Sequence, residues 1–183
     1  MEIEQTKLAG CFIIKPKVFK DSRGYFFESF NRRKYNQILG EELQFVQDNQ
    51  VASNYGVVRG LHFQTGENAQ AKLVQVVRGS VLDVVVDCRK GSPTFLQSFS
   101  IEINETNKYQ LFVPRGFAHG YAVLEDQTIF AYKCDNYYEK ASESGINLND
   151  SQLNIDWKIP TDKMIISDKD RDLPFIDPVN KPS

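Results

Sequence analysis

Apolar and β-branched residues recur along most of this chain in short runs, separated by turns rich in Gly, Pro, Asn and Asp. The strongest signal lies at residues 72–77 and 81–87, which are predicted to be two strands joined as a hairpin by the tight glycine turn Arg78-Gly79-Ser80. Further strands are predicted at residues 11–19, 25–30, 45–51, 95–103, 110–113, 117–124 and 128–134. Because many short strands recur at near-regular spacing, the pattern favours an antiparallel sandwich, jelly roll or barrel.

Three features interrupt the β pattern in the first quarter of the chain. Pro16 predicts an edge strand, or a break between two short strands, because proline cannot donate a hydrogen bond to a sheet. Residues 20–24 have the composition of a turn, so Arg23 is expected to be exposed. Apolar residues at helical spacing between Asn31 and Leu43 predict one short helix.

A length of 183 residues suits one well-cored domain and is short for two. We predict a single domain whose core barrel covers about residues 10–138. Beyond Tyr137 the composition becomes polar, with Asp, Asn and Pro, which predicts a C-terminal cap of short helical turns and loops at about residues 139–183. Pro178 and Pro182 mark its tail.

Charge and composition narrow the range of partners. The formal net charge of -2 gives no basic footprint for nucleic acid, which favours a small molecule or a protein as partner. The first five residues lack the features of a signal peptide, and no apolar run approaches the length of a membrane span, so a soluble, cytoplasmic protein is expected. Cys11, Cys88 and Cys134 are widely spaced and odd in number, which fits buried reduced thiols better than disulfides or a zinc site.

The stretch Val57-Val58-Arg59-Gly60-Leu61-His62-Phe63-Gln64 holds one of the two histidines of the chain. An imidazole can move a proton near neutral pH, and the guanidinium of Arg59 suits a phosphate; a buried, hydrogen-bonded histidine is the alternative interpretation of His62. Residues three apart in a regular strand point to opposite faces, so Arg59 and His62 can share a site only if the strand is irregular. Glycine within a strand often marks a bulge, and we predict one at Gly60.

A metal site is the first chemistry to consider, because Pro114-x-Gly116-x-x-His119 looks like the second signature of the cupin superfamily. The first cupin signature contains a pair of histidines, whereas only His62 is present here. A metal would need both histidines and one or two carboxylates, with Lys72 unfavourably close if it shares their face. We therefore predict no metal and no other cofactor.

Acid–base chemistry fits the remaining side chains better. His62 can remove a proton next to a carbonyl group if a preorganised cation such as Lys72 stabilises the enolate oxygen. Tyr132, a phenol in an otherwise apolar strand, can return a proton to the opposite face of the carbon, and the net result is inversion. A core tyrosine with a hydrogen-bonded hydroxyl is an equally good interpretation of Tyr132.

Six motifs stand in order along nearly the whole chain: Lys17-Val18-Phe19-x-Asp21-x-Arg23-Gly24-Tyr25-Phe26-Phe27-Glu28-Ser29, Phe45-Val46-Gln47-Asp48-Asn49, Arg59-Gly60-Leu61-His62-Phe63-Gln64, Gly66-Glu67-Asn68-Ala69-Gln70-x-Lys72-Leu73-Val74, Pro114-x-Gly116-Phe117-Ala118-His119-Gly120 and Ser167-x-Lys169-Asp170. Together they resemble the dTDP-4-dehydrorhamnose 3,5-epimerase family. The resemblance implies an all-β fold, a cupin-type jelly roll or double-stranded β-helix barrel, with a few short helices. It also implies a homodimer with exchanged N-terminal strands, and metal-free epimerisation at C3 and C5 of dTDP-4-dehydro-6-deoxy-D-glucose.

The resemblance further implies catalytic roles for individual residues. His62 is the base, and Asp170 orients its imidazole and stabilises the charged form of the ring. Tyr132 is the acid, and Lys72, assisted by His119, steadies the enolate oxygen. Without the resemblance, the segment around Asp170 would be interpreted as a helix N-cap followed by acidic residues.

Binding roles follow from the same resemblance. Arg59, and Arg23 from the partner subunit, are expected on the pyrophosphate, and Tyr138, or less readily Tyr137, is expected to stack on thymine. The residues expected to contact the nucleotide or the sugar are Phe26, Glu28, Gln47, Asn49, Glu143 and Lys169. Related enzymes of the same fold epimerise one carbon only, or shift a keto group, on similar dTDP-sugars, and both activities remain alternatives. A more remote alternative is a metal-dependent or non-catalytic cupin.

Overall fold

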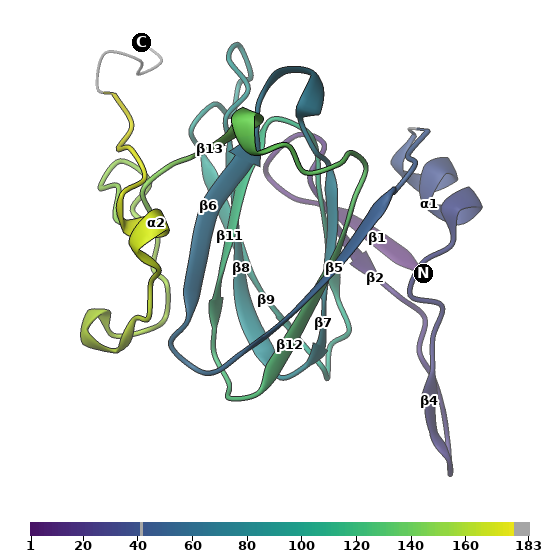
Figure 1. The fold of residues 1–183 in the computed structure, drawn as a ribbon. Helices are drawn as coiled ribbons and strands as arrows, with labels where there is room; N and C mark the ends of the chain where they lie inside the picture. Colours follow the sequence, from purple (N-terminus) through teal and green to yellow (C-terminus); the bar gives the residue numbers. More distant parts are fainter. Residues whose placement is uncertain (41, 178–183) are drawn as a thin grey trace.

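The structure, a computed structural model, describes residues 1–40 and 42–177. Two antiparallel sheets lie face to face and form most of it (Figure 1). The six-stranded sheet contains, in spatial order, β1 (Glu2–Gln5), β2 (Phe12–Lys15), β10 (Gln110–Val113), β7 (Lys72–Arg78), β12 (Thr128–Cys134) and β5 (Gln47–Ser53). The five-stranded sheet contains β13 (Glu143–Gly145), β6 (Val58–Gln64), β11 (Phe117–Val123), β8 (Ser80–Asp87) and β9 (Ser98–Asn104). The fold is an all-β jelly roll, as predicted.

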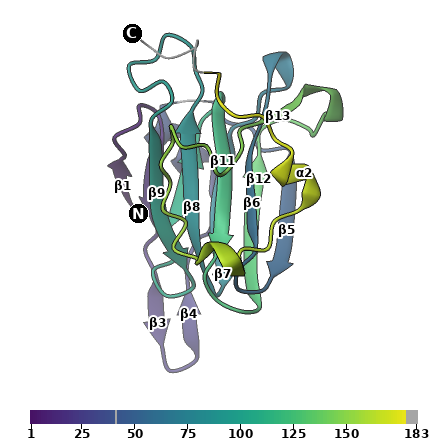
Figure 2. The same ribbon diagram turned by 90° about the vertical axis from the view of Figure 1, so that its left-hand side faces the viewer.

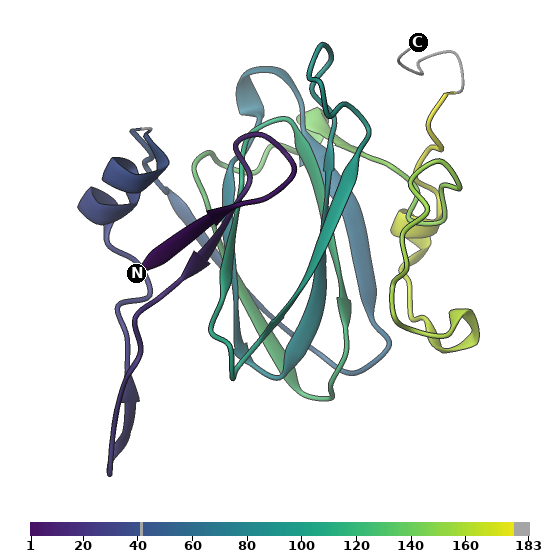
Figure 3. The ribbon, with the colours of Figure 1, turned by 180° about the vertical axis from the view of Figure 1, so that it is seen from behind.

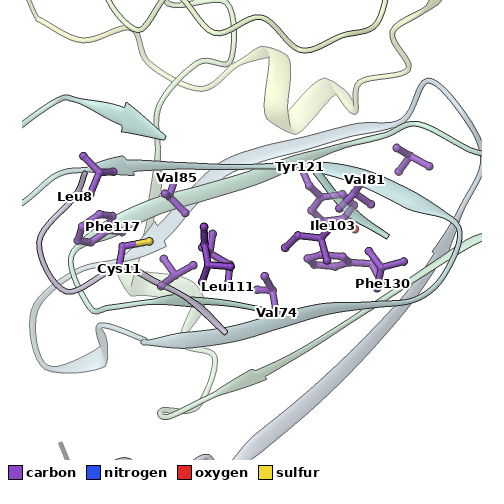
Figure 4. Close-up of a cluster of buried hydrophobic side chains, with 14 residues drawn as sticks. Leu8, Cys11, Val74, Val81, Val85, Ile103, Leu111, Phe117, Tyr121 and Phe130 are labelled. Carbon is purple, nitrogen blue, oxygen red and sulfur yellow. The ribbon is translucent and has the colours of Figure 1, made fainter. Parts of the chain in front are cut away.

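The main hydrophobic core lies between the two sheets (Figure 4). Side chains alternate along each strand: on β8, Val81 and Val85 face this core, whereas Leu82 and Val84 pack on the outer face. The facing sheet contributes Phe130 on β12. Burial on both faces explains why β8 is a continuous apolar run in the sequence rather than an alternating one.

The C-terminal segment covers the outer face of the five-stranded sheet (Figure 2). It carries β13 and the short helical turns η2 (Lys140–Ser142), η3 (Thr161–Lys163) and α2 (Asp168–Arg171). Trp157 packs in this layer, and its indole N–H donates to the backbone oxygen of Leu148 at 3.0 Å. The helical turns and loops predicted after residue 138 are therefore present, while the predicted tail at Pro178 and Pro182 lies outside the described residues.

Helix α1 (Arg32–Leu39) lies against the outer face of the six-stranded sheet. The Asn31 side chain caps its N-terminus by accepting a hydrogen bond from the Lys34 N–H, and Gly40 ends it in the left-handed conformation, at φ +69°. Tyr35 is buried against the sheet, where its hydroxyl donates to Gln110 Oε1 at 2.6 Å. The predicted short helix is confirmed. Neither α1 nor any other helix in the described ranges has the length and apolar character needed to cross a bilayer.

A hairpin of β3 (Phe19–Asp21) and β4 (Gly24–Phe26) projects from the body of the structure (Figure 1, Figure 3). It follows the predicted break at Pro16, just after β2 ends. Its aromatic side chains, Phe19, Tyr25 and Phe26, are exposed. We call residues 17–28 the arm.

The aromatic strand predicted at residues 25–30 was wrong beyond Phe26, where β4 ends. Phe30 packs instead against Tyr35 and Phe45, with ring centroids 5.0 Å and 5.3 Å away. These contacts draw the chain into the start of α1 rather than along a sheet. β5 was predicted two residues too early, and β9 was predicted to begin three residues too early.

The hairpin predicted at Arg78-Gly79-Ser80 was also wrong, although both of its strands are present. β7 pairs with β10 and β12 in the six-stranded sheet, whereas β8 pairs with β11 and β9 in the five-stranded sheet. Gly79, at φ +79°, therefore turns the chain from one sheet to the other. A glycine turn encodes a reversal of the backbone, but tertiary packing decides which strands pair.

Candidate active site

Side chains from both sheets line a cavity with β5, β7 and β12 on one side and β6, β11 and β13 on the other. It consists of two adjoining lobes of about 320 Å³ and about 370 Å³, which we call together the site cavity. Both volumes lie in the range of small-molecule sites. The predicted site residues that line both lobes are His62, Lys72, Tyr132, Tyr138 and Glu143.

The register of β6 shifts at Gly60, which brings Arg59 and His62 to the same face. His62 is paired with His119 on β11, and Arg59 with Tyr121, so three steps along β6 match two along β11. At Gly60 φ is +117°, and a Cβ there would lie 2.6 Å from the backbone of β11, so only glycine fits. Arg59 and His62 both line the site cavity, and the predicted irregularity is confirmed.

His62 and Asp170 form a hydrogen-bonded pair on the wall made by the five-stranded sheet. The distance from His62 Nε2 to Asp170 Oδ1 is 2.8 Å, and Asp170 Oδ2 accepts from the Gly60 N–H at 3.2 Å. Burial by itself raises the pKa of the Asp170 carboxyl, but the hydrogen bond and charge of His62, with the Gly60 N–H, outweigh burial, and the pKa lies below its ordinary value. Asp170 belongs to α2, whose N-cap is Ser167, so the helix cap and the contact with His62 are both present.

Lys72 on β7 and Tyr132 on β12 line the cavity from the six-stranded sheet. Lys72 Nζ lies 6.0 Å from the centroid of the Tyr132 ring. Burial lowers the pKa of the Lys72 ammonium group. Burial also raises the pKa of the Tyr132 hydroxyl, which therefore keeps its proton at neutral pH and can donate it.

A second histidine–carboxylate pair lies beside the first. His119 Nε2 is 3.1 Å and 3.0 Å from the two carboxylate oxygens of Asp83, and both side chains are buried. Asp83 was not among the predicted site residues. The signal was available, because a carboxylate within the apolar run of β8 needs a partner when it is buried.

A chain of hydrogen bonds links five predicted binding residues around the cavity. The Tyr138 hydroxyl donates to Glu143 Oε2 at 2.8 Å, and Lys169 Nζ donates to Glu143 Oε1 at 2.6 Å. Gln47 Oε1 accepts from the Tyr138 N–H at 3.2 Å, and Gln47 Nε2 donates to Asn49 Oδ1 at 3.1 Å. Tyr138, rather than the tyrosine before it, lines the cavity.

Three further predicted binding residues lie on the arm and line neither lobe: Arg23, Phe26 and Glu28. The Arg23 side chain is 88% exposed and pairs with Asp21 at 2.6 Å. Phe26 is exposed, and Glu28 pairs with Lys34 at 2.7 Å. A single chain therefore does not bring these three residues to its own site.

Comparison with known proteins identifies the family. The sequence model of the dTDP-4-dehydrorhamnose 3,5-epimerase family matches residues 5–177. This chain belongs to that family. The dTDP-4-dehydrorhamnose 3,5-epimerase of Shigella flexneri is 46% identical over 170 residues, which are 93% of each chain. The crystal structure of the enzyme of that name from Elizabethkingia anophelis NUHP1 is 50% identical, with a TM-score of 0.92 and 96% of each chain covered. The dTDP-6-deoxy-D-glucose-3,5-epimerase of Legionella pneumophila Philadelphia 1, solved in complex with dTDP-4-keto-L-rhamnose, is 44% identical, with a TM-score of 0.91 over 95% of this chain and 92% of that one.

Membership of the 3,5-epimerase family confirms the resemblance carried by the six motifs. His62 and His119 are each hydrogen-bonded to a carboxylate. Within residues 1–40 and 42–177, no group of three or more His, Cys, Asp or Glu side chains is arranged to hold a metal ion. Cys11 and Cys134 are buried and Cys88 is half-buried, and all three are free thiols. Cys134 also lines one lobe of the cavity, where burial raises its pKa to about 11.

Proposed function

We propose that this chain converts dTDP-4-dehydro-6-deoxy-D-glucose into dTDP-4-dehydro-L-rhamnose by inverting C3 and C5 through acid–base chemistry. His62, paired with Asp170, lines the site cavity from the five-stranded sheet, and Lys72 and Tyr132 line it from the six-stranded sheet. A base and an acid on opposite walls can act on opposite faces of one carbon, which inversion requires. Family membership supports the choice of substrate.

The first step removes a proton from C3 or C5. These hydrogens are acidic because the electron pair left behind moves onto the C4 oxygen as an enolate. Since the Nε2–H of His62 donates to Asp170, Nδ1 keeps a lone pair that can accept the proton, and the carboxylate stabilises the resulting imidazolium. Lys72, assisted by His119, stabilises the charge on the C4 oxygen. A positioned acid or base of this kind accelerates a step by about 10²–10⁴-fold.

The second step returns a proton from Tyr132 to the opposite face of the same carbon as the enolate reverts to the ketone. The carbon has then exchanged one proton for another, and its configuration is inverted. His62 is left protonated and Tyr132 ionised, so a proton must leave His62 and another must reach Tyr132 through solvent before the second inversion. Each inversion therefore places a solvent-derived hydrogen on the carbon.

Substrate binding is assigned to the charged and aromatic groups around the cavity. Arg59 lines the cavity and has no ion-pair partner among the described residues, and its planar guanidinium matches phosphate oxygens, so it binds the pyrophosphate. Tyr138 stacks on thymine. The residues that contact the nucleotide or the sugar are Gln47, Asn49, Glu143 and Lys169.

The chain acts as a homodimer in which the arm of each subunit reaches the site of the other. The exposed aromatic side chains of the arm support this arrangement, because contiguous exposed apolar surface marks protein interfaces. The arm then carries Arg23, Phe26 and Glu28 to the neighbouring site, where Arg23 adds a second cation for the pyrophosphate. We place the protein in the cytoplasm, as expected from its sequence.

Incubation of the wild-type protein with the dTDP-4-keto sugar in D₂O tests the reaction. The proposal predicts deuterium at both C3 and C5 of the product, because each inversion draws its hydrogen from solvent. Deuterium at only one of the two carbons would indicate a single-site epimerase instead of a double epimerase. Movement of the keto group to another carbon would indicate a ketoisomerase.

A further inference from the structure

Tyr121 on β11 carries a buried hydroxyl group for which the described residues offer no hydrogen-bond partner. The side chain is 5% exposed and lines one lobe of the site cavity. Its ring stacks on Phe130 in the core between the sheets, with centroids 4.1 Å apart (Figure 4). The ring is therefore fixed in place while its polar end lacks a partner. A buried hydroxyl without a hydrogen bond costs folding free energy, so such a group in a cavity wall points to a bound partner.

The neighbours of Tyr121 place it beside the proposed reaction centre. In strand register Tyr121 lies between Arg59 on β6 and Asp83 on β8. His119 stands two residues earlier on the same face of β11, with ring centroids 6.4 Å apart. Tyr121 is thus two residues along β11 from the position where His119 faces His62, and it lies opposite Arg59.

The chemistry of the hydroxyl favours a sugar over a phosphate as its partner. A neutral hydroxyl both donates and accepts hydrogen bonds, as sugar hydroxyl groups do. Tyr121 also has the cation Arg59 on one side and the carboxylate of Asp83 on the other, so opposite charges flank it and a neutral ligand group suits its hydroxyl. The anion is better placed at Arg59.

We infer that the Tyr121 hydroxyl hydrogen-bonds an oxygen of the bound hexose and helps to hold the sugar between the two walls of the cavity. This role rests on the proposed function, since it requires a sugar nucleotide in the site. Arg59 holds the pyrophosphate and Tyr121 holds the sugar, so loss of the Tyr121 hydroxyl affects only ligands that carry the sugar.

Calorimetric binding of two ligands tests this role: dTDP, which has no sugar beyond the nucleoside, and dTDP-L-rhamnose, which has a hydroxyl at C4 and does not form an enolate. Tyr121→Phe removes one atom and keeps the ring that stacks on Phe130. The variant should bind dTDP-L-rhamnose about threefold to tenfold more weakly than wild type, the range expected for one hydrogen bond, and bind dTDP unchanged. Its melting temperature without ligand should equal or exceed that of wild type, because an unpaired buried hydroxyl has been removed.

Ser53→Ala is the matched control. Ser53 carries the other buried side-chain hydroxyl without a partner in the described residues, and it lines neither lobe of the cavity. This variant should change neither affinity. If Tyr121→Phe binds both ligands as wild type does, or if the wild-type protein gains no affinity from the sugar, the inference is overturned. Equal weakening of both ligands also overturns it, because the contact would then be with the nucleotide. Failure of the proposed function would appear separately, as a wild-type protein that binds dTDP-L-rhamnose but places no deuterium on C3 or C5.

Discussion

His62 and Asp170 stand 108 positions apart in the chain, yet His62 Nε2 and Asp170 Oδ1 lie 2.8 Å apart. The contact exists because the C-terminal segment packs over the outer face of the five-stranded sheet and places the short helix α2 beside β6. Asp170 also accepts from the Gly60 N–H, so the same carboxylate is held by the irregular part of the strand that carries His62. The C-terminal segment therefore contributes to the site and also covers the outer face of the five-stranded sheet.

Replacing Asp170 by asparagine should lower kcat by about 10²–10⁴-fold with little change in KM, because a neutral amide cannot stabilise the positive charge that the imidazole gains when it takes the proton. Steady-state kinetics with the dTDP-4-keto sugar measures both constants. Asp168→Asn is the control, since Asp168 is exposed on the same short helix and lines neither lobe of the cavity. Equal activity of Asp170→Asn and wild type would remove Asp170 from the mechanism.

Lys72→Met should abolish most activity while raising stability at neutral pH. Burial lowers the pKa of Lys72 in the folded state, so below that pKa the charged ammonium destabilises the fold relative to the unfolded chain. The gain from Lys72→Met should shrink as pH rises through the lowered pKa toward the unfolded value of about 10.4. Urea unfolding at several pH values measures the gain, and kcat should fall by about 10²-fold or more. A variant that is both inactive and less stable at neutral pH would contradict this account of Lys72.

Asp87 offers a pH test away from the site. Burial raises the pKa of its carboxyl, but hydrogen bonds from Arg89, Ser92 and Thr94 outweigh burial and hold the pKa well below its ordinary value. The ionised carboxylate therefore stabilises the fold above the unfolded pKa of about 3.9, and this contribution is lost as pH falls through the lowered folded value. Asp87→Asn should be less stable than wild type at pH 7, and the difference should shrink below about pH 4. A difference in unfolding free energy that stays constant from pH 7 to pH 3 would refute the assignment.

Gly60→Ala should destabilise the fold by about 1–3 kcal/mol or more and reduce activity. At φ +117° a side chain is strained, and the added Cβ would lie 2.6 Å from a backbone atom of β11. Relief of that clash moves the segment that brings Arg59 and His62 to one face. Gly66→Ala in η1 (Gly66–Asn68) is the control, because φ there is +64° but nothing lies within 4 Å of the added Cβ. Thermal unfolding gives the melting temperature of both variants. The extra loss in Gly60→Ala measures the cost of the clash, because backbone strain is present in both.

Mixing two defective variants tests the exchange of arms. Arg23→Ala and His62→Ala should each be nearly inactive as homodimers. If Arg23 acts in the neighbouring site, a mixed dimer contains one site with both residues intact, and random reassociation should restore about a quarter of wild-type activity. If Arg23 serves its own site, or if the chain is a monomer, mixing restores nothing.

The strand pattern and the Gly60 irregularity could be predicted because both are local. Alternation along β6 demanded a shift between Arg59 and His62, and the glycine between them was the residue that permits one. The turn at Gly79 was assigned to a hairpin because its composition describes only the reversal, whereas the neighbours of β7 and β8 depend on the whole jelly roll. The end of β4 was missed because aromatic residues favour strands equally well when they pack beside a helix, as Phe30 does.

The site itself is formed by long-range contacts, which sequence patterns do not encode. Asp170 could be linked to His62 only through the family resemblance, since the local pattern predicts no more than a helix cap. Asp83 carried a local signal, a carboxylate in a run of valines, but its partner His119 lies on another strand. The unpaired hydroxyl of Tyr121 is visible only once the packing around it is known.

If His62 and Tyr132 act from opposite walls on opposite faces of the same carbon, variants of the two residues must lose different parts of the reaction, which isotope exchange in D₂O distinguishes. Tyr132→Phe should still exchange hydrogen at C3 and C5 for deuterium, because His62 removes and returns the proton on one face, but the recovered sugar should keep its original configuration. His62→Ala should show neither exchange nor inversion. If Tyr132→Phe forms the inverted product at the wild-type rate, the assignment of the acid is wrong and the two-wall account fails.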